Sequence, residues 1–470
     1  MNSAAPETAR RDGASSRRLR RPLLGVLLGV IAAALLAPAA AGAVPPQYPN
    51  QWSSPVNGLR QLPVTTDTRA FCKGPSGSVY VVALSHSVSS NAVIARLRVA
   101  DGAVLKSWTY PARPGAAGSI PRAAASDAQR NLFVALEQVG APRDWRVVKY
   151  SPSGALRWSR RYDSGNGADV PQGMVVDHHG NVIVVGTSEG HGSGGYDGAV
   201  VKWSATGALL WKRLISAPGK DLFEAVAVDA ADNVYVAGQL GSGAPVLARA
   251  ALRAYSPAGR LRWTAGAKDS LRDLSFTSLV VKGSGVYVAG VAGNDPASAE
   301  LIAAKYTVAG KRGWSGVKVR SYPHGAWAKG LAVDRSGAAV LVGVAYGAGG
   351  SGEDLGAVWK LKPGGGTAWH REFGNSLWPY DGQFSAVGID SKERVYAAGG
   401  VSVSASTANL LMVRYSSGGS EQALWRSDGQ QSGSCDFSHV LVLSDSAVLA
   451  AGRVAGYGAN AAVYRAKTTP

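Results

Sequence analysis

The sequence predicts an all-β fold in which short antiparallel strands repeat around a ring, a β-propeller. The first observation is composition: 60 glycines and 13 tryptophans accompany only 3 methionines in 470 residues. Glycine serves tight turns, and tryptophan packs well between sheets. The second observation is that one short apolar segment recurs along the chain. Beyond the N-terminus, no long segment has apolar residues at helical spacing, so we expect strands throughout.

The recurring segment is clearest as N-V-I-V-V-G, which begins at Asn181. Eight copies begin at Ser78, Asn131, Asn181, Asn233, Gly285, Ala339, Arg394 and Ala447. A period near 50 residues with about four strands in each repeat is the signature of propeller blades. One repeat cannot bury both faces of its small sheet, so the blades must stack against their neighbours. We expect about eight repeats of 50–56 residues.

The four strands of a blade can be placed in one repeat. The innermost strand is G-M-V-V-D (173–177), and a D-x-x-G-N turn leads to N-V-I-V-V-G. The third strand, A-V-V-K-W, begins at Ala199, and the fourth, L-L-W-K-R-L, begins at Leu209 after the turn S-A-T-G. Two equivalent hairpins carry Pro at the second turn position and Gly at the fourth, which suits a type I turn.

The count of strands predicts how the ring closes. Eight second strands and eight third strands are present, but only seven fourth strands with their Trp follow them. Trp52, in N-Q-W-S, supplies the missing one. We therefore expect an eight-bladed β-propeller with four-stranded antiparallel blades, in which the N-terminal residues 50–56 pair with residues 461–466 to close the last blade. A seven-bladed ring with a degenerate terminal repeat is the alternative.

The first 43 residues predict a secretory signal peptide. Four arginines between Arg17 and Arg21 precede the apolar stretch 23–36, and Ala41-Gly42-Ala43 supplies small residues for cleavage. We expect residues 44–470 to form a single propeller domain that is secreted, extracellular or periplasmic, with no membrane span. A retained anchor is the alternative, although the apolar stretch is short for a bilayer.

The formal net charge is +18, and it stays at +14 without the six arginines and two acids of residues 1–43. This balance favours anionic partners. Basic residues recur about once per strand, and nothing resembles a nucleic-acid-binding motif. We expect a monomer that contacts an anionic envelope polymer or a protein partner. The alternative is that Lys and Arg only solvate exposed strands and edges.

Five repeats keep a Gly four residues before the Trp of the fourth strand. The pairs are Gly154/Trp158, Gly207/Trp211, Gly259/Trp263, Gly310/Trp314 and Gly365/Trp369. This spacing resembles bacterial propeller-repeat families and, more distantly, the tryptophan-docking repeats of quinoprotein (PQQ-like) dehydrogenases and the outer-membrane assembly propeller. The resemblance spans nearly all of residues 44–470 and implies that the Trp packs between adjacent blades. It specifies architecture rather than function. Trp108 and Trp425 depart from the spacing.

Six repeats carry an Asp just before the inner strand: Asp67, Asp169, Asp221, Asp273, Asp381 and Asp436. We expect them near one mouth of the ring, where facing carboxylates would raise one another's pKa values or hold a cation. Hard oxygen ligands favour calcium or magnesium. The alternative is that each Asp accepts hydrogen bonds from its own loop.

Other acidic positions have simpler expectations. A second series opens the D-x-x-G type turns and is expected to cap them: Asp127, Asp177, Asp229, Asp334 and Asp390. Asp197 and Asp354 fall at matching positions of two long loops. Such loops carry binding function when there is any, and solvated loop tips are the alternative.

Catalytic motifs are missing from the sequence. The seven histidines are scattered over different repeats, and none lies in an H-x-x-x-H pattern, so a zinc hydrolase has little support. There is no G-x-S-x-G elbow, P-loop or dinucleotide fingerprint. The adjacent Cys-Cys pair of one quinoprotein family is also missing. We expect a non-catalytic binding or scaffolding module without a cofactor such as PQQ. The alternative is a quinoprotein-like oxidoreductase, or a polysaccharide lyase or hydrolase, acting at the channel mouth.

The two cysteines, Cys72 and Cys435, belong to the first and eighth repeats, which are neighbours across the expected seam. Paired cysteines usually form a bridge in an oxidising compartment. Cys72 aligns beside Val175, whereas Cys435 aligns with Asp169, six residues earlier. At about 3.3 Å per residue, that offset approaches ~20 Å, far beyond the Cα separation of roughly 4.4–6.8 Å in a bridge. We expect two thiols. A disulfide, the alternative, requires an irregular entry of the first strand.

Overall fold

The chain divides into two units, Met1–Val44 and Pro45–Pro470. The computed structural model describes residues 52–55, 66–85, 91–110, 117–140, 143–165, 167–190, 195–243, 247–268, 271–293, 299–315, 324–348, 352–373, 381–404, 407–426, 431–432, 435–454 and 460–467. The expected signal peptide, residues 1–43, lies outside this part. Among the described residues, no helix is long and apolar enough to cross a membrane.

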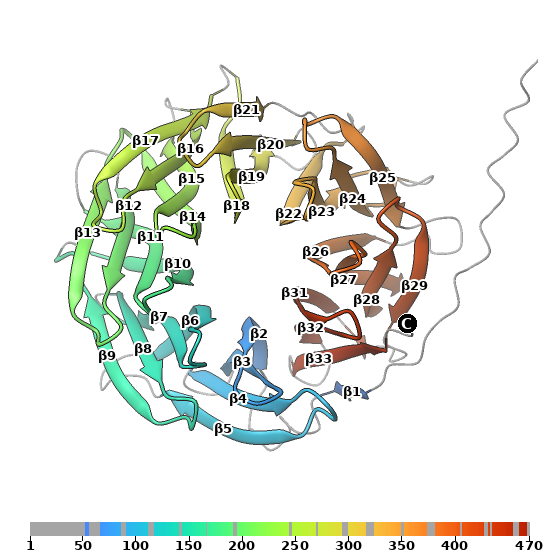
Figure 1. Cartoon of the computed structure of the whole chain (residues 1–470), viewed down its shortest axis with the longest axis horizontal. Helices are drawn as coiled ribbons and strands as arrows, with labels where there is room; N and C mark the ends of the chain where they lie inside the picture. Colours follow the sequence, from blue (N-terminus) through green and yellow to red (C-terminus); the bar gives the residue numbers. More distant parts are fainter. Residues whose placement is uncertain are drawn as a thin grey trace, which may run out of the picture. The chain divides into compact units, whose positions relative to one another are not determined.

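The second unit is a ring of antiparallel sheets (Figure 1). Seven sheets, named blades 1 to 7, are each built from four consecutive strands, with the first strand innermost. Blades 1 to 3 contain β2 (Thr66–Lys73), β3 (Ser78–Ser85), β4 (Ala92–Arg98) and β5 (Val104–Tyr110); β6 (Gly118–Ser126), β7 (Leu132–Val139), β8 (Asp144–Tyr150) and β9 (Leu156–Tyr162); and β10 (Asp169–Val176), β11 (Val182–Glu189), β12 (Tyr196–Trp203) and β13 (Leu209–Ile215).

Blades 4 to 7 follow the same plan. They contain β14 (Lys220–Val228), β15 (Val234–Ser242), β16 (Arg249–Tyr255) and β17 (Leu261–Ala267); β18 (Leu274–Lys282), β19 (Gly285–Ala292), β20 (Glu300–Thr307) and β21 (Arg312–Ser315); β22 (Ala326–Val333), β23 (Ala339–Ala345), β24 (Leu355–Leu361) and β25 (Thr367–Phe373); and β26 (Gly382–Ile389), β27 (Val395–Ser404), β28 (Thr407–Tyr415) and β29 (Glu421–Arg426). In blade 7 a short fifth strand, β30 (Gln431–Ser432), pairs with β28.

The remaining sheet takes its strands from both ends of the second unit, in the order β1-β33-β32-β31. Its members are β1 (Trp52–Pro55), β31 (Cys435–Ser444), β32 (Ala447–Val454) and β33 (Asn460–Lys467). Trp52 lies opposite Arg465, and Pro55 lies opposite Ala462. The predicted count of eight blades therefore needs correction: seven blades form from uninterrupted chain, and an eighth sheet exists only as this composite.

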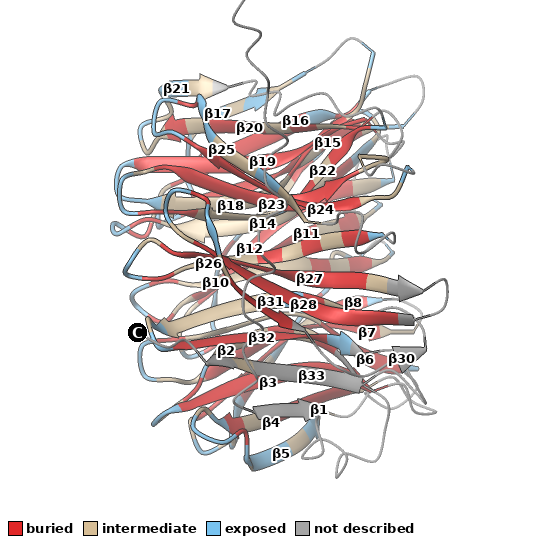
Figure 2. Cartoon of the chain, turned by 90° about the vertical axis from the view of Figure 1, so that its right-hand side faces the viewer, coloured by how far each residue is buried: buried red, intermediate tan, exposed pale blue. Residues whose placement is uncertain are grey.

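Each pair of neighbouring sheets shares one hydrophobic core. Eight clusters of buried side chains join successive sheets around the ring, including one between blade 7 and the composite sheet and one between the composite sheet and blade 1. Figure 2 shows that the buried residues follow the strands and that exposed residues gather at the turns. Because a single blade is thin, most of its apolar area is removed from water only by its neighbours.

The Trp residues of blades 2 to 6 bind the next blade. Each indole N–H donates to a backbone carbonyl in the turn between the third and fourth strands of the following blade. The pairs are Trp158–Ala205, Trp211–Pro257, Trp263–Val308, Trp314–Pro363 and Trp369–Ser417, at 2.9 to 3.1 Å. Trp108 departs from this pattern, as its spacing indicates, and packs edge-on against Tyr80 and Tyr150.

The Gly of the same turn explains the Gly-x-x-x-Trp spacing. Gly259 has φ +78°, and a Cβ built on it would lie 2.7 Å from the Trp211 ring of the preceding blade. The position therefore needs both a left-handed backbone and the space that a missing side chain leaves.

The second Asp series caps its turns, which confirms that expectation. In all five turns the Asp Oδ1 accepts from the backbone N–H four residues later, at 2.8 to 2.9 Å. In blade 3, Asp177 also contacts the buried Lys202 amine at 2.8 Å, and this amine donates to Pro257 O of blade 4 at 3.3 Å.

Deleting residues 44–58 tests the composite sheet. Without β1, the outer edge of β33 loses its partner and ring closure weakens, so the melting temperature of the whole propeller should fall in one cooperative step. Deletion of residues 2–43 alone is the control and should leave the melting temperature unchanged. An unchanged melting temperature after the longer deletion would contradict a closing role for β1.

Gly259→Ala should destabilise the protein more than Gly195→Ala. Both glycines have positive φ, but nothing lies within 4 Å of a Cβ built on Gly195. Backbone strain should cost about 1 kcal/mol in each variant, and the clash with Trp211 should add roughly 1–3 kcal/mol only at Gly259. Denaturant unfolding measures the difference, and equal losses would show that the Trp contact contributes nothing.

Candidate functional site

Every inner strand of the ring, including that of the composite sheet, has a β-bulge at the same position. The bulged residues are Arg69, Arg122, Gln172, Glu224, Thr277, Lys329, Ser385 and Ser438. The residue before each of them is buried, whereas the bulged residues are half-buried or exposed. A bulge redirects the side chain that it carries, so these residues leave the cores between the blades. Six residue types occupy these eight positions, and no repeat motif marks them in the sequence.

Polar side chains on the inner strands link adjacent blades from blade 4 onward. The Ser275 hydroxyl donates to Glu224 Oε1 at 3.1 Å. The Lys329 amine donates to Gln383 Oε1. The Ser385 hydroxyl donates to Asp436 Oδ2 at 2.8 Å. We call these six residues the axial network: Glu224, Ser275, Lys329, Gln383, Ser385 and Asp436.

Titratable groups of this region have shifted pKa values. Burial raises the pKa of Asp436 to about 6, although the Ser385 hydrogen bond and the Lys329 charge oppose the rise. Burial also raises the pKa of Glu224. Partial burial lowers the pKa of Lys329, and the nearby charge of Asp436 opposes this effect. On β31, burial lowers the pKa of His439 to about 4. Clustered shifts of this kind are common at functional sites.

The six Asp residues of the expected ring occupy different register positions. Asp169 lies opposite Ser188, whereas the matching position of the composite sheet holds Cys435 and places Asp436 one residue later. Because successive strand residues point to opposite faces, Asp436 and Asp169 do not share a face. Asp67 lies in β2, and its side chain is outside the described part of the chain.

Four of the six accept hydrogen bonds from backbone N–H groups, and two of them, Asp169 and Asp221, do so within their own loop, as the alternative interpretation expects. The pairs are Asp169 with Ser164 at 2.8 Å, Asp221 with Gly241 at 2.7 Å and Ala217 at 2.5 Å, Asp273 with Ala248, and Asp381 with Asp354 at 3.0 Å. The Asp354 carboxylate accepts from the Gly347 N–H at 3.0 Å. Asp197, expected at a loop tip, instead lies in β12 and is fully buried.

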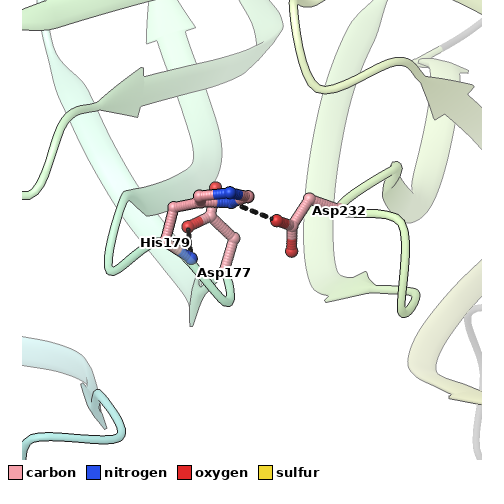
Figure 3. Close-up of side chains that lie close together, drawn as sticks. All are labelled: Asp177, His179 and Asp232. Atoms are coloured by element: carbon pink, nitrogen blue, oxygen red, sulfur yellow. Dashed lines mark hydrogen bonds and ion pairs between the residues drawn. The ribbon is translucent and has the colours of Figure 1, made fainter.

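A second group joins blades 3 and 4 at the turns between first and second strands (Figure 3). Atoms of Asp177, His179 and Asp232 lie within 4.8 Å of one another. Asp232 accepts from His178 Nδ1 at 2.7 Å and from His179 Nδ1 at 2.6 Å. Burial alone would raise the pKa of Asp232, but these hydrogen bonds lower it. Both histidine rings are exposed. Since these atoms already bond to one another, we interpret the group as a contact between blades.

The outer strands β5, β9, β13 and β17 form a basic outer wall on blades 1 to 4. Their charged residues are all cations: Lys106, Arg157, Arg160, Arg161, Lys212, Arg213 and Arg262. The same strands expose Leu105, Leu156, Leu209, Leu210 and Leu261. Arg213 stacks on Trp211 and donates to Gly259 O at 2.9 Å, so it is held in place. Arg157, Lys212 and Arg262 are exposed.

The cysteines occupy the registers that the alignment predicts. Cys72 lies opposite Tyr80 in blade 1, and Cys435 lies opposite Val454 in the composite sheet. They are not joined by a disulfide. Burial raises the pKa of the Cys72 thiol to about 12, so this sulfur is a poor nucleophile.

No protein-family model matches the chain, and no curated protein matches it. Among solved structures, the fold is similar to quinohemoprotein alcohol dehydrogenase ADHIIG from Pseudomonas putida HK5, with 12% identity over 86% of this chain and 75% of that chain and a TM-score of 0.54. It is also similar to a europium-containing methanol dehydrogenase, with 12% identity over 88% and 85% of the two chains and a TM-score of 0.53. At this identity the likeness shows the propeller fold, which is shared with quinoprotein dehydrogenases, and nothing of the chemistry.

Asp436 and His439 should give opposite pH dependences of stability. The pKa of Asp436 rises from 3.8 to about 6 on folding, so the folded state binds the extra proton in that window and stability falls as pH rises through it. The pKa of His439 drops from 6.5 to about 4, so the unfolded state binds the extra proton and stability rises with pH between those values.

The two single variants separate these contributions. From pH 4 to 6.5, Asp436→Asn should make stability rise more steeply with pH than in the parent protein, whereas His439→Gln should make it fall. Each change should amount to about 1–3 kcal/mol across the window. Denaturant titrations at several pH values measure both slopes, and parallel curves for all three proteins would contradict the assignment.

Proposed function

We propose that the protein is an exported binding or scaffolding module that holds an anionic polymer of the cell envelope on its basic outer wall. The observation that carries the proposal is the charge of this wall: four neighbouring outer strands contain cations and no acidic residue. A net charge of +18 by itself would only favour anionic partners in general. The seven cations of these outer strands, with no acidic residue among them, give such a partner a place to bind.

The repeat supports recognition of a long, regular ligand. Because each blade repeats the same outer strand, similar cations recur around the ring, as Arg157, Lys212 and Arg262 do on blades 2 to 4. Exposed leucines between them favour contact with the less polar parts of the same ligand. Individual surface charges contribute little, typically below about 1 kcal/mol each, so affinity would come from many weak contacts and fall with salt.

The expected signal peptide supports an envelope location for this function. A secreted chain meets wall polymers, acidic polysaccharides and lipid headgroups before it meets nucleic acid. Among these, an extended polymer suits a wall that curves around four blades better than a small anion does.

An enzyme is the second candidate, and the axial network is the observation that favours it. Asp436, Glu224 and Lys329 have shifted pKa values on the inner side of the ring. A quinone cofactor such as PQQ carries carboxylates, and the network offers two carboxyl groups against one amine, so its residues do not fit this group and we derive no redox step. A quinone band in the absorption spectrum of the purified protein would favour this candidate.

Charge reversal tests the outer wall. The triple variant Arg157→Glu, Lys212→Glu, Arg262→Glu should bind a defined anionic polymer, such as polyglucuronate or wall teichoic acid, at least about 10-fold more weakly. Binding by the parent should weaken between 50 mM and 300 mM salt, roughly as screening predicts. Calorimetry or co-sedimentation measures the affinities.

The matched control is Lys73→Glu, Lys362→Glu, Lys392→Glu, which changes the net charge equally at exposed turns and strand ends outside the outer strands of the wall. The control should retain most of the parent's affinity. Equal losses in both triple variants would show that only net charge matters, and no loss in the first would remove the wall from the proposal.

A further inference from the structure

One row of residues crosses blade 3 with oxygen-bearing side chains. Asp169 of β10 lies opposite Ser188 of β11, and Ser188 lies opposite Asp197 of β12. Residues directly opposite each other in neighbouring strands point to the same face of a sheet. All three are fully buried, with an exposed fraction of 0%.

This face packs against blade 2. Side chains alternate between faces along a strand, so Ser188 shares its face with Val184, and Asp197 shares its face with Ala199. Both apolar residues belong to the hydrophobic cluster that joins blades 2 and 3, together with Tyr162 of β9. The row therefore points into the seam between these two blades, toward Tyr162.

Several carboxylate oxygens of this seam lack protein partners. Both carboxylate oxygens of Asp197 and the Oδ1 atom of Asp169 have no hydrogen-bond partner, whereas the Ser188 hydroxyl lies close enough to Asp169 and to Tyr162 to lower the pKa values of both. A buried carboxylate without a partner costs several kcal/mol or more. By contrast, both carboxylate oxygens of Asp221, the residue of blade 4 that corresponds to Asp169, accept hydrogen bonds from backbone N–H groups.

The surrounding charge is negative. Asp144, Asp163 and Asp169 have oxygens within 4.8 Å of one another. Arg161 forms ion pairs with Asp144 at 2.7 Å and with Asp163 at 2.8 Å, and its charge also acts on Asp169, but no ion pair to Asp169 or Asp197 is found among the described residues. Burial raises the pKa of the Tyr162 hydroxyl to about 12, with a smaller contribution from the charges of Asp169, Asp163 and Asp197, although a hydrogen bond with Ser188 opposes the rise.

We propose that a divalent cation with a preference for oxygen, calcium in the first place, binds in this seam between Asp169 and Asp197, with Ser188 and the Tyr162 hydroxyl beside it. Carboxylate and hydroxyl oxygens are the ligands that calcium takes, and six to eight of them, water included, complete its shell. No sulfur or imidazole is among these groups, so a soft metal is disfavoured. The cation would neutralise the unpaired carboxylates and join blade 2 to blade 3.

This site differs from a ring of six facing carboxylates. It uses one member of that series, Asp169, and depends on Asp197, which belongs to none of the repeated positions before the inner strands. The site borders the basic outer wall at Tyr162 of β9, where the Lys212 amine lies over the ring at 5.9 Å, but none of its proposed ligands is changed in the charge-reversal variant, so the two proposals are tested separately.

The test uses the full chain after removal of metals with EDTA. Calcium at about 100 times its dissociation constant should raise the melting temperature of the parent by roughly 2–5 °C. Terbium, which replaces calcium, should show luminescence sensitised by Tyr162 and Trp145, whose rings lie 4.9 Å apart, and calcium should displace it.

Asp197→Asn should lose this binding or weaken it at least about 10-fold, while Asp381→Asn, a distant capping Asp, should bind as the parent does. In EDTA the Asp197→Asn variant should melt no lower than the parent, because it removes an unpaired buried charge. The melting temperature in EDTA therefore distinguishes the loss of a metal ligand from damage to the fold.

The proposal fails if the parent binds neither calcium nor terbium, or if Asp197→Asn keeps the parent's affinity. If the parent binds no metal and the Asp197→Asn variant is more stable than the parent in EDTA, then Asp197 is protonated or hydrated in the seam. This result would also overturn the proposed cation site.

Discussion

The hydrogen bond from a Trp indole to the turn of the next blade is the contact on which the rest of the ring depends. It recurs in blades 2 to 6 and joins the outer strand of each of these blades to the next blade. The turn can approach the indole only because its Gly has no side chain, as at Gly259. The same geometry brings Arg160 and Arg213 onto the Trp rings and lets them bond to the Gly carbonyls of the next blade, which fixes part of the outer wall.

The outer strands of blades 1 to 4 carry charges of one sign, whereas the inner strands carry both signs. Cations occupy the outer strands of blades 1 to 4, where solvent screens their mutual repulsion. Carboxylates instead collect at the ends of inner and third strands, where loops donate N–H groups to most of them. At Asp197, in the seam between blades 2 and 3, no such donor reaches the carboxylate. Both proposals rest on this distribution: an anionic polymer would contact the basic outer wall, and a small cation would bind in the acidic seam.

Propeller architecture is a weak guide to activity. The fold is shared with quinoprotein dehydrogenases at 12% identity, yet the inner side of this ring carries its own set of residues at the eight bulge positions. Three members of the axial network, Glu224, Lys329 and Ser385, stand at these bulges, and their partners Ser275, Gln383 and Asp436 come from other positions of the inner strands.

The sequence alone determined the features that are local or repeated. Strand period, turn chemistry, the caps of the second Asp series and the Trp spacing follow from residues a few positions apart, and the offset between Cys72 and Cys435 follows from counting in the repeat. The pairing of Trp52–Pro55 with β33 could also be predicted, by counting the strands of each repeat. Only the tertiary structure decided the bulged ring, the contact of Asp232 with both histidines, and the burial of Asp197. Each of these depends on a neighbouring blade about 50 residues away in the chain, or on one extra residue that redirects a side chain, and no local pattern records either.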